Sequence, residues 1–198
     1  MEGKRGTGVV EGRKDCEASV MSCENICLMY TNVDCLSNKM SDFKVFLNSL
    51  SNKPNVIAIT EVNPKSSKYK RKESEFSLEG YNLFSVNIGG DSIFRGIIVY
   101  VSQNLKATQI DVSSNFSECL LLQLQVDIHN SFLLGTFYRS PSSTSDNDQY
   151  LINTLNELSC RYKCKSLFVG DFNLGNINWN TCTSTCSKQV EIAFLSCL

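Results

Sequence analysis

Short apolar runs and amphipathic helical patterns follow one another in an order that few folds accommodate. The sequence predicts a strand over 26–30, a helix over 37–52, a strand over 56–60, and further strands over 81–88, 95–101, 105–112, 118–127 and 131–138. A helix over 145–161, a strand over 167–170 and a helix beginning at 189 follow. We expect Ser145 to open the second of these helices, with Asp148 as its capping-box partner. Hairpins mixed with longer connections predict an α+β protein in which two sheets lie between helical layers.

The length and composition are those of one globular domain. The chain has 198 residues, of which 42% are hydrophobic, and this is enough to bury a core. Residues 1–22 are polar and aperiodic, which predicts a disordered lead-in before a domain over 23–198. The sequence has no secretory signal and no apolar run of about 20 residues, so we expect an intracellular protein without a membrane partner.

Charge and cysteine content exclude two simple interpretations. The net charge of −1 offers no strong overall field to nucleic acid, so any DNA binding must come from local basic patches. Ten cysteines are present, but no C-x-x-C pair occurs and the chain has one histidine, so the sequence does not support a zinc site. Scattered core or surface thiols are the expected arrangement.

Four of the predicted strands end in or lead to polar residues that could contact a metal ion or a phosphate. They are Asn32, Glu61, Tyr138 with Arg139, and Asp171 with Asn173. Taken singly, Asn32 is more often a turn residue, Glu61 a solvated acid, and the Asp171–Asn173 segment an Asx turn. Together, strand ends that meet at one edge of the sheets would form a shared rim, and ligand sites gather on such rims.

A basic segment follows Glu61. Its charged residues are Lys65, Lys68, Lys70, Arg71 and Lys72. Such a run is usually a solvated loop. Beside a metal site it could instead bind the DNA backbone, with an affinity that falls as salt increases.

Five segments carry a resemblance to a known family. LMYTNVDCLSNK, VIAITE, RGIIVYV, LLGTFYRSP and LFVGDFNLGNINW resemble, in order and approximate spacing, segments of the endonuclease domains of non-LTR (LINE-type) retrotransposons. These domains belong to the endonuclease/exonuclease/phosphatase superfamily, and the similarity runs from Asn25 to the end of the chain. It implies a four-layer αββα sandwich of the DNase I type, incomplete at the carboxyl end. It also implies DNA as partner, a nuclear location with the cytoplasm as an alternative, and a reverse transcriptase domain in the full-length parent element.

The resemblance assigns a role to each residue of the rim. Glu61 matches a metal ligand for Mg²⁺, with Mn²⁺ as an alternative, and Asn32 matches the asparagine that supports the metal and the nucleophile. Tyr138 matches a phosphate-contacting tyrosine, and Asp171 the aspartate that orients and deprotonates the attacking water. Asn173 matches an asparagine that holds the phosphate or the water. The reaction implied is hydrolysis of a phosphodiester bond in DNA.

The remaining assignments concern substrate binding and the scaffold. Arg139 could add a phosphate contact, and the basic loop with Lys68, Lys70, Arg71 and Lys72 could hold the DNA backbone. Trp179 matches the tryptophan that follows GDFN in the family, and we expect it to pack against the scaffold.

The sequence departs from the family pattern in one respect. The family completes its site with a Ser-Asp-His segment near the carboxyl end, and no such segment occurs in this chain. His129 is the only histidine, and the strand that ends at Tyr138 would place it about 30 Å from the rim. We therefore expect a truncated domain that is weak or inactive as an enzyme, because loss of a preorganised donor costs about 10²–10³ in rate.

Two other functions remain open. A phosphatase that acts on small phosphorylated molecules would use the same fold and metal site. A non-catalytic remnant that binds nucleic acid through the basic loop would need no metal. Magnesium-dependent cleavage of DNA distinguishes the endonuclease from both.

Overall fold

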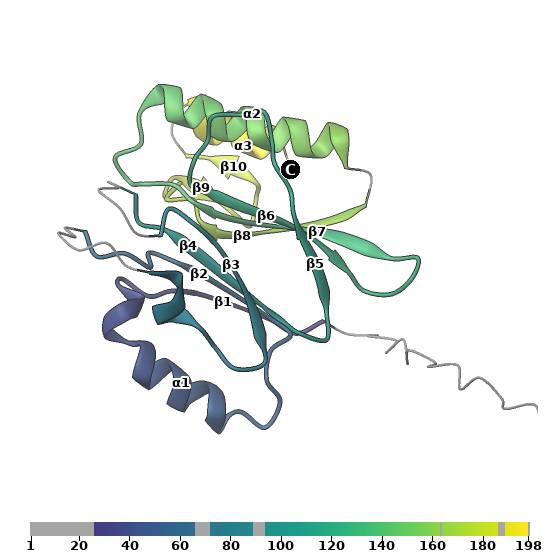
Figure 1. Ribbon diagram of the computed structural model, residues 1–198. Coiled ribbons are helices and arrows are strands. Elements are labelled where there is room, and N and C mark those ends of the chain that lie inside the picture. Colours follow the sequence, from purple (N-terminus) through teal and green to yellow (C-terminus); the bar gives the residue numbers. More distant parts are fainter. Residues whose placement is uncertain (1–25, 66–71, 89–93, 163, 186–188, 198) are drawn as a thin grey trace, which may run out of the picture.

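The computed structural model describes residues 26–65, 72–88, 94–162, 164–185 and 189–197. Two sheets lie face to face, with α1 on one side and α2 with α3 on the other (Figure 1). The predicted lead-in over 1–22 and the residues Lys68, Lys70 and Arg71 lie outside the described residues.

The first sheet has the strand order β1-β2-β4-β3. Its strands are β1 (Leu28–Asn32), β2 (Val56–Thr60), β3 (Tyr81–Val86) and β4 (Ile97–Ser102). β1 runs parallel to β2, and the other pairs are antiparallel. The crossover between β1 and β2 carries a short 3-10 helix (Leu36–Asn38) and α1 (Met40–Ser49), so the predicted helix begins later and ends earlier than its pattern suggested.

The second sheet has the strand order β5-β6-β7-β8. Its strands are β5 (Lys106–Gln109), β6 (Cys119–Gln125), β7 (Ser131–Tyr138) and β8 (Lys165–Asp171). β6 and β7 form the predicted hairpin, and β8 runs parallel to β7 after the crossover helix α2 (Ser145–Arg161). The predicted capping box is wrong: Thr144 caps α2 by accepting a hydrogen bond from the Asn147 N–H, and Asp148 pairs with Arg139.

Alternation of side chains along the strands produces three apolar layers. Val99, Leu122 and Leu134 belong to the core between the two sheets. Ile57 and Leu47 belong to the layer between the first sheet and α1. Leu133, Leu151 and Leu155 pack between the second sheet and α2. The predicted α+β, four-layer αββα architecture is therefore confirmed.

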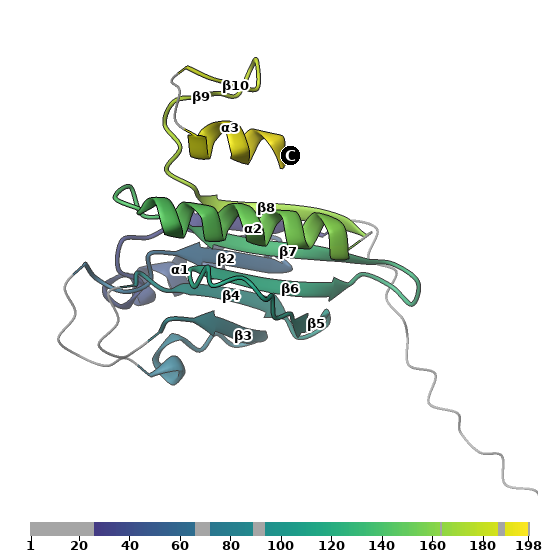
Figure 2. The same ribbon diagram turned by 90° about the horizontal axis from the view of Figure 1, so that it is seen from above.

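A small substructure follows β8 (Figure 2). It contains the hairpin of β9 (Ile177–Asn178) and β10 (Thr183–Ser184), which had not been predicted, and α3 (Gln189–Ser196). Trp179 contacts Phe194 of α3 edge-on at 6.4 Å between ring centroids, yet 57% of it is exposed. The predicted scaffold contact is thus present, although much of the ring faces solvent. Among the described residues, no helix is long and apolar enough to cross a bilayer.

Candidate active site

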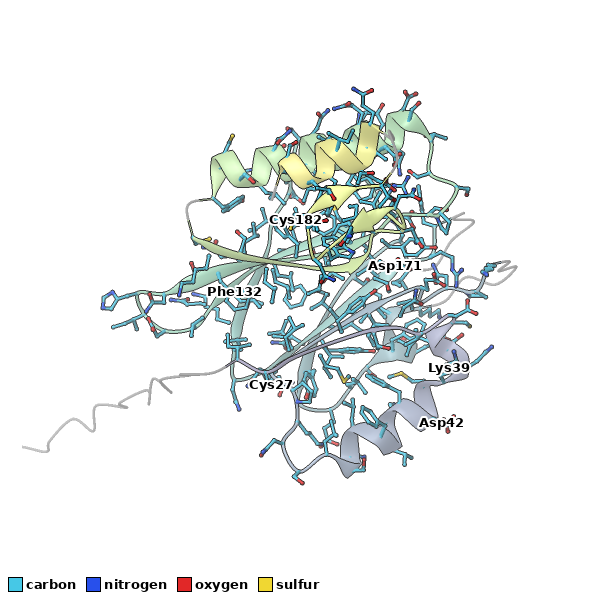
Figure 3. All side chains as sticks on the ribbon, turned by 180° about the vertical axis from the view of Figure 1, so that it is seen from behind. Cys27, Lys39, Asp42, Phe132, Asp171 and Cys182 are labelled. Atoms are coloured by element: carbon cyan, nitrogen blue, oxygen red, sulfur yellow. The ribbon has the colours of Figure 1, made fainter. Side chains whose placement is uncertain are left out.

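Strand register brings the predicted polar residues to one end of the sandwich. Asn32 pairs with Thr60, the residue before Glu61, and Tyr138 pairs with Asp171. The Asn32 side-chain amide donates a hydrogen bond to Asp171 Oδ2 at 3.3 Å, which links the ends of the two sheets. Figure 3 shows Asp171 and Phe132 at opposite ends of the second sheet. These strand ends therefore form the shared rim that the sequence predicted.

Glu61 lies at the centre of this rim and has a strained backbone. Its φ of 58° is left-handed, a conformation that costs a residue with a side chain about 1–2 kcal/mol. Its Oε2 lies 2.6 Å from Nη2 of Arg95. Glu61, which follows β2 of the first sheet, and Tyr138, at the end of β7 in the second sheet, line a common cleft.

Tyr138 is buried, and its hydroxyl remains a proton donor. Burial is the main cause that raises its pKa to about 12, and the negative charge of Glu61 acts in the same direction. The pKa of Tyr30, in β1, is also raised. Burial raises its pKa first, and the charges of Asp171 and Glu61 raise it further. Both carboxylates therefore lie close enough to Tyr30 to act on it.

Asp171 is positioned by a close approach of two strands. Gly170 has φ 146°, and a Cβ atom at this position would lie 1.9 Å from the carbonyl oxygen of Phe137. Only glycine fits there, so β8 reaches Asp171 at a fixed distance from β7. Asp171 Oδ1 accepts the Asn173 N–H at 3.2 Å, which forms the Asx turn, while Oδ2 contacts Asn32. One carboxylate thus forms both the Asx turn and the contact with Asn32 at the rim.

Arg139 and Asn173 hold the loop after β8. The Asn173 side-chain amide donates to the Arg139 carbonyl at 2.7 Å, and Arg139 Nη1 donates to the Asn173 carbonyl at 3.1 Å. The Arg139 guanidinium is buried and makes two hydrogen bonds to Asp148, at 2.7 and 3.0 Å. These contacts engage all three guanidinium nitrogens, so Arg139 stabilises this loop, and its phosphate contact stays a prediction.

Three charged residues of the site had not been predicted. Arg95 is only 7% exposed, Glu118 is only 8% exposed, and Asp34 lies 2.5 Å from Arg95 Nη2. Burial raises the Glu118 pKa to about 7, although the Arg95 N–H donates to its carboxylate. A charged residue just before a buried strand was the available signal, because Glu118 directly precedes β6 and Arg95 lies two residues before β4.

A cleft of about 270 Å³ opens at this rim. It is lined by Glu61, Lys65, Arg95, Glu118, Tyr138, Ser140 and Pro141. Of the basic loop, Lys65 lines the cleft, while Lys72 is exposed and its N–H bonds to Glu75. His129 lies in the β6–β7 turn at the opposite end of β7, as predicted, with its N–H bonded to Asp127.

The donor set of the rim suits one kind of metal ion. Among the described residues, no three Asp, Glu, His or Cys side chains gather closely enough to enclose an ion. The rim instead offers carboxylate oxygens from Glu61 and Asp171 and the amide oxygen of Asn32. Mg²⁺ commonly binds one or two carboxylates and completes its shell with water and substrate phosphate, and Mn²⁺ accepts similar ligands. These residues therefore fit such an ion, whereas a zinc site would require more nitrogen or sulfur ligands.

The fold is shared with solved nucleases. The AP endonuclease LMAP from Leishmania major superposes with a TM-score of 0.60 at 13% identity, over 87% of this chain and 65% of that one. The endonuclease domain of TRAS1, a telomere-specific non-LTR retrotransposon, gives 0.59 at 14% identity, over 88% and 69%. The 3'-5' exonuclease NExo from Neisseria meningitidis gives 0.51 at 14% identity, over 85% and 69%. No family model matches the sequence, and comparison with curated proteins finds no match.

The chain therefore has the endonuclease/exonuclease/phosphatase fold, the DNase I-like sandwich that its motifs predicted. It spans 65% of the length of the Leishmania enzyme. At 13–14% identity this likeness concerns the fold, so the activity has to be argued from the residues of the rim.

Proposed function

We propose that this chain is a metal-dependent phosphodiesterase domain that cleaves DNA, of the kind found in non-LTR retrotransposons. The observation that carries the proposal is that the two sheets bring four of the predicted residues to one rim. Asn32 bonds to Asp171, and Tyr138 and Glu61 line the same cleft. The superposition with the TRAS1 endonuclease domain supports the same assignment.

Each residue of the rim has a chemical task in this proposal. Glu61 and Asn32 would hold Mg²⁺ or Mn²⁺, which when bound would neutralise charge on the phosphate oxygens. Asp171 accepts a proton from the attacking water, whose oxygen bonds to phosphorus as the P–O bond to the leaving oxygen breaks. Asn173 orients the phosphate or the water. Tyr138 remains protonated at neutral pH and serves as a hydrogen-bond donor in the cleft.

We expect the reaction to be slow. The chain has one histidine, His129, and it lies at the far end of β7 from the rim. The rim therefore has no imidazole to stabilise charge on the phosphate, and loss of a donor of this kind costs about 10²–10³ in rate.

The partners follow from the same proposal. DNA is the substrate, and Lys65, which lines the cleft, would attract its backbone together with the basic loop that extends to Lys72. The retrotransposon resemblance adds a reverse transcriptase domain in the full-length parent element and a nuclear location.

Nicking of supercoiled plasmid in Mg²⁺ or Mn²⁺ tests the proposal. Asp171→Asn and Glu61→Gln should abolish nicking, and circular dichroism should show that both variants are folded. Asp127→Asn is the matched control, because Asp127 forms an equivalent Asx turn with His129 at the other end of β7. Equal nicking by Asp171→Asn and Asp127→Asn would refute the assignment.

The same preparation distinguishes the two alternative functions. Release of phosphate from phosphoinositides without plasmid nicking would indicate the phosphatase. Binding of DNA that weakens with salt, without cleavage in either metal, would indicate a non-catalytic remnant.

A further inference from the structure

Arg95 is the most enclosed cation of the cleft and contacts the proposed metal ligand directly. Its Nη2 lies 2.6 Å from Glu61 Oε2 and 2.5 Å from Asp34 Oδ1, and its Nε donates to the Asn63 carbonyl at 3.0 Å. The guanidinium is therefore held by two carboxylates and one carbonyl. A buried arginine with so many contacts keeps one orientation.

The backbone around Glu61 is attached to the backbone around Arg95. The β2–β4 ladder ends at Thr60 opposite Ile97, and hydrogen bonds resume beyond Glu61. The Val62 N–H donates to the Gly96 carbonyl at 3.3 Å, and the Asn63 N–H donates to the Arg95 carbonyl at 2.7 Å. These bonds keep the backbone around Glu61 beside that of Arg95, and the ion pair then fixes the carboxylate against the guanidinium.

This geometry gives the two oxygens of Glu61 different surroundings. Oε2 forms a short ion pair with Arg95, so Oε1 is the Glu61 oxygen that this ion pair leaves for a metal ion. Ca²⁺ takes six to eight oxygens and readily binds both oxygens of one carboxylate, whereas Mg²⁺ requires a compact octahedron. A carboxylate that offers one oxygen therefore suits the smaller ion.

We propose that Arg95 is a positioning residue that restricts Glu61 to one metal-facing oxygen and so makes the site prefer Mg²⁺ over Ca²⁺. The inference rests on the proposed function, because it takes Glu61 as a metal ligand. Arg95 itself touches neither the ion nor the substrate in this scheme. Its role is to select the ion through the geometry of Glu61.

Competition binding tests the selectivity without any cleavage assay. Mn²⁺ binding is measured by electron paramagnetic resonance, and Mg²⁺ and Ca²⁺ are added as competitors. From the wild type, Mg²⁺ should displace Mn²⁺ at a lower concentration than Ca²⁺ does. Arg95→Met frees both Glu61 oxygens and should raise the relative affinity for Ca²⁺ by about tenfold or more. Arg95→Lys keeps a cation on Oε2 and should stay within about threefold of the wild-type ratio.

A destabilised control separates selectivity from folding. Tyr100→Phe removes a buried hydrogen bond to the Phe76 carbonyl, in the layer between the first sheet and α1, and should leave the ion ratio unchanged. If Arg95→Met does not fold, infrared spectra of the wild type decide instead. Carboxylate bands that Mg²⁺ changes in the wild type and not in Glu61→Gln should show the wide splitting of single-oxygen binding, and narrow splitting would overturn the inference.

The outcomes distinguish this inference from the proposed function. If the wild type binds metal and folded Arg95→Met has the same relative affinity for Mg²⁺ and Ca²⁺, only the role of Arg95 is overturned. Absence of Mn²⁺ binding in the wild type overturns both the metal site and the inference. A ratio that shifts in Arg95→Met and is restored in Arg95→Lys supports the inference.

Discussion

Replacing Glu118 with glutamine should stabilise the protein more at neutral pH than at acid pH. Glu118 is 8% exposed, and its carboxylate accepts the Arg95 N–H at 3.1 Å. Burial raises its pKa from 4.5 to about 7, and the charge of Glu61 contributes to the rise. Glutamine has a similar shape and keeps an oxygen that can accept the Arg95 N–H, so the substitution removes mainly the ionisation.

The sign follows from the two states of the chain. Below the pKa that Glu118 has in the unfolded chain, its carboxyl is protonated in both the folded and the unfolded state. The stability that this protonated group contributes is then fully present. As pH rises from 4.5 to about 7, the unfolded chain releases the proton first, so the wild type loses stability. A pKa difference of this size corresponds to about 3 kcal/mol of unfolding free energy. Above the folded pKa both states are ionised and the loss is complete.

Urea unfolding followed by circular dichroism, from about pH 4.5 to about pH 8, measures this loss. The stability of Glu118→Gln relative to the wild type should increase by about 3 kcal/mol across the range. Glu157→Gln provides a control with no expected pH dependence, because hydrogen bonds from Ser113 lower the Glu157 pKa from 4.5. The stabilisation from Glu157 is lost only below this pH range, so the stability of Glu157→Gln relative to the wild type should stay nearly constant within it. A constant difference between wild type and Glu118→Gln, within about 0.5 kcal/mol, would refute the reasoning.

Two further substitutions test the structure of the rim. Gly170→Ala should destabilise the protein by about 4 kcal/mol or more, because its Cβ would lie 1.9 Å from the Phe137 carbonyl oxygen. Gly175→Ala, which meets nothing within 4 Å, should change stability by less than about 1 kcal/mol, and equal costs in urea unfolding would contradict this. Arg139→Met should cost about 3–5 kcal/mol, because it leaves the Asp148 carboxylate without its buried partner. Hydrogen exchange should then accelerate in the first turn of α2, and unchanged exchange would argue against this pair.

Local patterns were sufficient for most of the secondary structure. The predicted strands over 56–60 and 131–138 coincide with β2 and β7, and the predicted helix over 145–161 coincides with α2. These segments carry their signal in the spacing of their own apolar residues, which neighbouring elements do not alter. The two-residue strands β9 and β10 are too short to show any period, so no pattern predicted them.

Charged residues were harder to place because their partners lie elsewhere in the chain. Asp148 has the right spacing for a capping box, but Arg139 satisfies it, and Thr144 caps the helix. Arg95 precedes an apolar strand and resembled an ordinary strand end. Its ion pairs with Glu61 and Asp34 depend on contacts that no spacing in the sequence records.

The sequence by itself determined which residues face each apolar layer and which polar residues end the strands. Alternation along a strand is a local property, so it is written in consecutive residues. Only the tertiary structure decided which strand ends meet. Asn32 and Asp171 are 139 positions apart and belong to different sheets, yet they share a hydrogen bond. That contact depends on how one sheet packs across the other, because burial of apolar faces is non-directional and leaves no mark on the polar residues that it brings together.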